Sequence, residues 1–178
     1  EVTNMRDYAL WGIYISNFVF FVATSFVGTV TVAILRLTKN SWRTPLVRIA
    51  EIISVAAIIM AGITIMIDMA RPDRILNLFI HARLQSPITW DVVIIPTYMV
   101  ISLLLLYFPL LPDFAILKDR FKKKKPKWSK IYGKLSLHWT GSKAQKRLQE
   151  KSIKIIAIMI IPVGLLLQTI DAWLFSTT

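Results

Sequence analysis

The sequence has no cysteine and only two histidines, and these absences exclude several kinds of redox protein. Without cysteine the chain cannot form a disulfide, a thiolate metal site or an iron–sulfur cluster of its own. His81 and His138 both fall in connections between apolar runs. We therefore expect no iron–sulfur cluster in this chain and no haem held by paired histidines within it.

Acidic residues are also scarce: ten Asp and Glu stand against 22 Lys and Arg, which gives a net charge of +12. At the same time 55% of the residues are hydrophobic, and the mean hydropathy is +0.57. A soluble domain this apolar could not cover its surface, whereas a membrane protein confines its charges to the loops. The composition therefore indicates an integral membrane protein.

Four apolar runs are each long enough to span a bilayer, which requires ~20 residues in a helix. They cover residues 8–37, 45–69, 87–111 and 152–175. Backbone groups in lipid must bond to one another, and a helix achieves this within a single segment. We therefore predict an all-α integral membrane fold in which four transmembrane helices form one up-and-down bundle over residues 1–178.

Positive charge is concentrated on one side of this bundle. The loop between the first two spans, the basic loop at 112–151 and the helix turns beside them hold all but four of the Lys and Arg residues. The positive-inside rule places these loops in the cytoplasm and both ends of the chain outside, in a multi-pass protein of the cell membrane. An outside N-terminus in a chain that starts at Glu1 rather than Met predicts that it is a piece of a longer polypeptide.

The basic loop interleaves its lysines with Trp128, Tyr132 and Trp139, a composition that also occurs in nucleic-acid-binding segments. Beside membrane spans, the simpler interpretation is a segment that lies on anionic lipid headgroups with its aromatic rings at the interface. We therefore expect lipid, and no nucleic acid, as its partner. Residues 142–152 are expected to form a short amphipathic helix that leads into the last span.

Ionisable residues gather between the second and third spans, at the outer end of the predicted bundle. Charged groups at such a depth are costly in lipid and often mark a site. The residues of this outer mouth are Asp68, Arg71, Asp73, Arg74, Arg83 and Asp91. Asp68 and Asp91 could instead form ordinary ion pairs with the arginines, or Asp91 could cap its helix. Chemistry alone leaves both interpretations open.

The outer mouth offers carboxylates, arginines, an amide and aromatic rings, an inventory that suits a quinone. The quinone ring can lie against aromatic side chains, while its oxygens need hydrogen bonds and proton exchange. We therefore expect a quinone such as menaquinone, with Asp91 and Asp68 as the groups that handle its protons, and no metal. The other expected contacts are Arg71, Arg74, Trp90, Tyr8, Asn17 and Gln168.

Two further polar residues lie within the apolar runs. Asn17 needs a partner, either a bound ligand or another helix, because its amide stands in an apolar segment. Glu51 follows Arg48 by three residues, which predicts an ion pair at the inner boundary of the membrane. The alternative is that Glu51 relays protons from the inner side.

Five segments together resemble the NrfD/PsrC family, the integral membrane subunits of polysulfide reductase and related respiratory complexes. They are WGIYISNFVFFVATSFVGTVTVAILRL, ARPDR, SPITWDV, LPDFAILKDR and KIYGKLSLHWTGS. Their order is that of the family, and the resemblance covers nearly all 178 residues. The likeness is closest to the membrane subunits of alternative complex III.

The resemblance implies a longer subunit with two four-helix bundles, no redox centre of its own and an iron–sulfur partner on the outer face. In such relatives the aspartate of a Trp–Asp pair, here Asp91, and a histidine near the end of the second helix line the quinol site. Asp68 stands at that histidine position. Phe26 and Gln168 stand where relatives tend to have histidine.

We therefore expect the quinone-binding, membrane-anchoring subunit of a respiratory oxidoreductase complex, with an iron–sulfur subunit and other membrane subunits as partners. No activity is expected from the chain alone. One alternative is half of a proton-coupled transporter, for which helices broken at Pro96 and Pro162 would be the sign. The other is a structural membrane anchor that holds no ligand.

Overall fold

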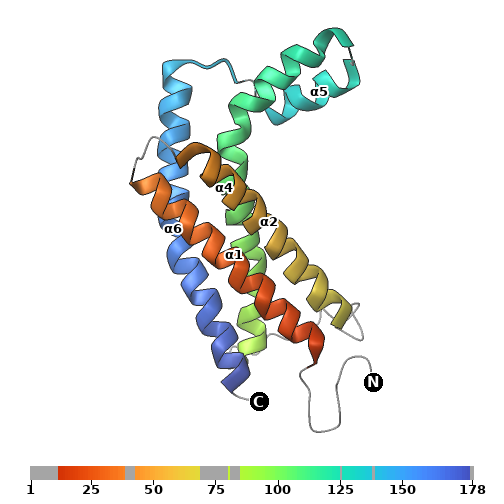
Figure 1. Ribbon diagram of the computed structural model, residues 1–178, viewed down its shortest axis with the longest axis vertical. Helices are drawn as coiled ribbons and strands as arrows, with labels where there is room; N and C mark the ends of the chain where they lie inside the picture. Colours follow the sequence, from red (N-terminus) through yellow and green to blue (C-terminus); the bar gives the residue numbers. More distant parts are fainter. Residues whose placement is uncertain are drawn as a thin grey trace.

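A computed structural model describes residues 12–38, 43–68, 80, 85–124, 126–137 and 139–176, and these residues form five helices (Figure 1). The helices are α1 (Ile13–Leu37), α2 (Arg43–Asp68), α4 (Pro87–Lys124), α5 (Pro126–Leu135) and α6 (Lys143–Ser176). Four of them, α1, α2, α4 and α6, are long and apolar enough to cross a membrane. The predicted all-α membrane fold is confirmed.

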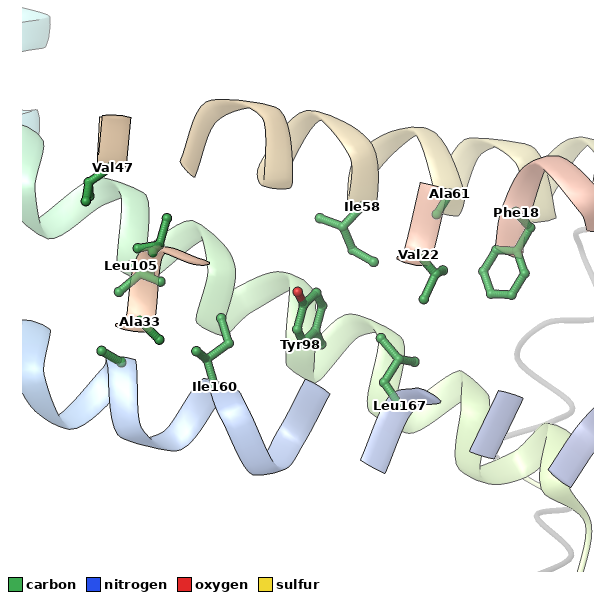
Figure 2. Packing of buried hydrophobic residues seen from close by; sticks show 12 residues of the cluster. Phe18, Val22, Ala33, Val47, Ile58, Ala61, Tyr98, Leu105, Ile160 and Leu167 are labelled. Carbon is green, nitrogen blue, oxygen red and sulfur yellow. The ribbon is translucent and has the colours of Figure 1, made fainter. Parts of the chain in front are cut away.

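The four long helices pack side by side in one bundle (Figure 1). Among the long helices, α1 packs mainly against α2 and α6, and α4 packs mainly against α6 and α2. Figure 2 shows the core residues that these helices contribute, with Tyr98 of α4 near the middle of the row. Many apolar side chains point outward instead, such as Phe20 and Met66, which are 64% and 60% exposed. An apolar outer surface is what a bundle in lipid requires.

A seven-residue spacing describes the contact between α4 and α6, which run in opposite directions. On α4 the buried positions include Asp91, Tyr98 and Leu105, each seven residues after the last. On α6 the matching buried positions are Ala157, Gly164 and Asp171. Such spacing keeps one side of each helix against its neighbour. A Cβ added at Gly164 would lie 3.3 Å from the Tyr98 ring, which places these two residues opposite each other.

Helix α4 continues well past the membrane run predicted at 87–111, and α5 folds back against its extension (Figure 1). The Tyr107 hydroxyl donates to the carbonyl oxygen of Leu135 (2.5 Å), and the Tyr132 ring stacks on Phe121 at 5.7 Å between centroids. The segment predicted as an amphipathic helix at 142–152 belongs to α6 and joins the last span without a break.

Candidate functional site

Two buried carboxylates face each other across α4 and α6, at the end of the bundle where α2 ends at Asp68. Asp91 lies in the second turn of α4 and Asp171 near the end of α6, and they are 6% and 5% exposed. Because the helices are antiparallel, the start of α4 and the end of α6, which carry these residues, lie at the same end of the bundle (Figure 1). Their carboxyl groups are within hydrogen-bonding reach of each other.

Three buried polar atoms at this end have no hydrogen-bond partner among the described residues. They are the Oδ1 atoms of Asp91 and Asp171 and the amide nitrogen Nε2 of Gln168. Gln168 precedes Asp171 by three residues, so both lie on one side of α6. Buried polar groups in proteins are normally satisfied. Two acceptors and one donor are therefore positioned for a ligand or for groups beyond the described residues.

The carboxyl pair can hold a proton between its oxygens. Two bare carboxylates in contact repel each other, and a shared proton converts that repulsion into a hydrogen bond. The low dielectric of a buried site strengthens both effects. The arrangement of Asp91 and Asp171 is therefore suited to taking up and releasing protons one at a time.

The residues predicted for the outer mouth divide into three groups. Asp91 and Gln168 lie at the carboxyl pair, and Asp68 ends α2 at the same end of the bundle (Figure 1). Trp90 and Asn17 lie on the outer surface of the bundle, Trp90 with 43% of its surface exposed. The remaining predicted residues, Tyr8, Arg71 and Arg74 with Asp73 and Arg83, lie outside the described residues, as does His81.

Asp171 was not among the predicted site residues, and the structure pairs it with Asp91. The seven-residue spacing of Asp91 with Tyr98, and of Gly164 with Asp171, was the signal in the sequence that could have joined the two. Phe26, which the resemblance set at a histidine position, lies deeper in the bundle. Its ring covers Gly164, where an added Cβ would meet it at 2.6 Å.

A cluster of hydroxyl groups, which the sequence interpretation also missed, occupies the middle of the bundle. The Tyr98 hydroxyl shares a 2.6 Å hydrogen bond with Thr29 and accepts one from Ser25 at 3.4 Å. Ser54 of α2 donates to the backbone carbonyl of Ser25 at 2.5 Å. The cluster joins α1, α2 and α4 in the core, where a polar group needs an internal partner.

The ion pair predicted between Glu51 and Arg48 is wrong in its partner. Glu51 instead bonds to Arg36 of α1, whose Nε and Nη2 both donate to Oε1. Arg48 bonds to Asp113 of α4 at 2.6 Å. Arg48 is exposed whereas Glu51 is buried, so the two side chains leave α2 in different directions. Each residue thereby ties α2 to a neighbouring helix.

Comparison with known proteins places the chain in a family. The family model described as "Polysulphide reductase, NrfD" matches residues 1–178. A protein of Halobacterium salinarum, provisionally named as a membrane subunit of dimethyl sulfoxide reductase, is 27% identical over 176 residues, which is 98% of this chain. The chain spans 37% of the length of that relative. The resemblance to alternative complex III subunits stays a prediction, but the wider expectation is confirmed: this chain belongs to the NrfD polysulphide reductase family.

Proposed function

We propose that this chain is the quinone-binding part of a membrane subunit in a respiratory oxidoreductase complex, and that Asp91 and Asp171 exchange the quinone's protons. The observation that carries the proposal is the buried carboxyl pair with its two unpartnered oxygens. Family membership supports a membrane anchor for quinone-linked electron transfer. The same atoms fit the ligand, since a quinone presents oxygens that accept and, once reduced, donate hydrogen bonds.

A bound quinone would supply two-electron chemistry that is coupled to two protons. The residues of the chain would supply the rest. Asp91 and Asp171 would share one proton at their facing oxygens and accept another at the unpartnered Oδ1 atoms. The Gln168 Nε2 group can donate a hydrogen bond to an oxygen of the ring. Burial of all three groups keeps bulk water from competing for these bonds.

The proposal also includes the electron partner, the side of the membrane on which the site lies and further contacts of the quinone. Because the chain has no cysteine to hold an iron–sulfur cluster of its own, we propose that an iron–sulfur subunit on the outer face exchanges electrons with the quinone. The relative's name places it in a reductase as a membrane subunit, which supports such a complex. The excess of basic residues beside the opposite end of the bundle supports an outer location for the carboxyl pair, in the cell membrane. Asp68, Arg71, Arg74 and Tyr8 stay proposed contacts of the quinone.

The test is an Asp91→Asn variant in the intact complex, with quinol-linked turnover as the readout. Loss of a proton-exchanging group lowers turnover by about 100-fold or more. The matched control is Asp113→Asn, which removes a carboxylate at the other end of the bundle, where Asp113 bonds to Arg48. We expect the control to stay within about twofold of the wild type. Undiminished turnover of the Asp91 variant would remove the residue from the mechanism.

The two alternative functions receive less support from the structure. A proton-coupled transporter of the expected kind has helices broken near the middle of the membrane. Helices α4 and α6 instead continue through Pro96 and Pro162. A structural anchor without a ligand would leave no quinone in the purified complex, so extraction and chromatography of bound lipids separates it from the proposal.

A further inference from the structure

A basic pocket opens at the opposite end of the bundle from Asp91, between the end of α1 and the first half of α6. Its volume is about 590 Å³. Figure 1 shows the end of α1 beside the first half of α6. The cationic residues that line the pocket are Arg36, Arg147, Lys151 and Lys154. The pocket lies far from the carboxyl pair, and the proposed quinone chemistry makes no use of it.

Helix geometry explains why three of these cations meet. Arg147, Lys151 and Lys154 follow one another at intervals of four and three residues, which is the spacing of one helix face. That face of α6 borders the pocket together with Arg36 in the last turn of α1. The contact between α1 and α6 holds the two sides together.

The pocket has an excess of positive charge. Glu150 is the one acidic residue in its lining, against four cations. Arg36 is bonded to Glu51, but within the described part of the chain no salt bridge joins Glu150 to Arg147, Lys151 or Lys154. Several like charges facing a shared hollow repel one another, and an anion placed among them relieves this repulsion. A phosphate group, with its negative oxygens, is the common biological anion that such lysines and arginines bind.

The position of the pocket beside the apolar segments favours a phosphate that belongs to a lipid. Leu37 and Ile153 also line it, at the level where the apolar segment of α1 ends and that of α6 begins. Four residues beyond Lys154, on the same face, Ile158 is 51% exposed, and on α1 Ile34 is 52% exposed. A phospholipid could therefore place its headgroup among the cations and its acyl chains along this apolar surface.

We propose that this pocket binds a phosphate group, and that the phosphate is the headgroup of an anionic phospholipid in the inner leaflet. The site is separate from the quinone site and would bind the lipid whether or not the quinone proposal holds. It fixes one lipid at the contact of α1 with α6, rather than attracting the membrane surface in general.

The experiment measures binding of a fluorescent phosphatidylglycerol to the intact, delipidated complex in neutral detergent, by fluorescence anisotropy. The variant Lys151→Gln/Lys154→Gln removes two pocket cations. The control Lys130→Gln/Lys134→Gln removes two exposed lysines from α5, outside the pocket lining. We expect the pocket variant to weaken binding about tenfold or more and the control to stay within about twofold. Glu150→Gln removes the acid and should tighten binding.

Three comparisons decide the result. Labelled phosphatidylcholine should bind at least about tenfold more weakly than phosphatidylglycerol, because it lacks net charge. Equal losses in the pocket and control variants would overturn the proposal, because they would show attraction to the overall basic surface. Displacement of the lipid by millimolar inorganic phosphate alone would overturn the lipid as the source and assign the pocket to a soluble phosphate.

Discussion

Asp91 on α4 and Asp171 on α6 face each other in the contact between these two helices. Seven residues farther into the bundle, the same contact places the Tyr98 ring against Gly164, whereas at Asp91 and Asp171 it brings two carboxyl groups together. Replacing both acids by apolar residues would suit packing better, because buried charge is costly in a membrane. The pair is therefore best explained by chemistry at this end of the bundle.

If the two carboxyl groups work as one proton-holding unit, their losses will not add. We predict that Asp171→Asn lowers quinol-linked turnover about as much as Asp91→Asn, and that the double variant is no worse than either single variant. The measurement is turnover of the intact complex for the two single variants and the double variant. Independent roles would instead multiply the two losses.

Gly164 provides a test of the bundle's packing that does not depend on function. Gly164→Ala places a methyl group 2.6 Å from the Phe26 ring, so we predict a loss of about 1–3 kcal/mol in stability. Gly62→Ala is the matched control, since outside its own stretch of helix no described atom lies within 4 Å of a Cβ added there. Thermal unfolding in detergent measures both. Equal melting temperatures would contradict the close approach of α1 to α6.

The sequence predicted the helices better than the contacts between them. Hydropathy alone finds α1, α2, α4 and α6, because each must satisfy its backbone in lipid. The partners of a side chain depend on which side of its helix faces inward. Hydropathy does not reveal that side, because in lipid the outward side is apolar too. Glu51 was therefore assigned to Arg48 on its own helix, whereas the bundle pairs it with Arg36.

Only part of the candidate site could be predicted, again because the sequence does not tell which side of each helix faces inward. Asp91 and Gln168 could be placed at one end of the bundle from topology, and Asp91 also from the resemblance. The contact of Asp171 with Asp91 depends on the rotation of both helices about their axes, which topology does not give. The hydroxyl cluster around Tyr98 was missed because serine and threonine also serve ordinary packing in membrane helices.

The hydroxyl of Tyr98 should contribute to stability through its partners. We predict that Tyr98→Phe costs about 1–3 kcal/mol, because Thr29 and Ser25 lose a shared partner inside the core. Thr97→Val is the control, since the exposed Thr97 hydroxyl bonds to Val93 O of its own helix. Urea or thermal unfolding of the purified protein gives both values. A Tyr98 variant as stable as the control variant would contradict the cluster.

The two ion pairs of α2 should differ in strength because they differ in burial. The side chains of Arg36 and Glu51 are 17% and 2% exposed, whereas those of Arg48 and Asp113 are 45% and 33% exposed. Glu51→Gln removes the buried carboxylate to which Arg36 is bonded, and we predict a loss of about 3–5 kcal/mol. Arg48→Gln should cost at most about 1 kcal/mol. Unfolding of both variants tests the difference, and similar losses would contradict the burial of the Arg36–Glu51 pair.

The proposed orientation can be tested with single introduced cysteines, because residues 1–178 contain none. Gln85, in the turn before α4, and Lys143, at the start of α6, are both exposed and lie at opposite ends of the bundle. We predict that a membrane-impermeant maleimide added to intact cells labels the Gln85→Cys variant and not the Lys143→Cys variant, because the positive-inside rule predicts a cytoplasmic location for the basic loops. Permeabilised cells should give labelling of both, which serves as the control for accessibility. The reverse pattern in intact cells would place Asp91 and Asp171 on the cytoplasmic side, and with them the protons that the pair exchanges.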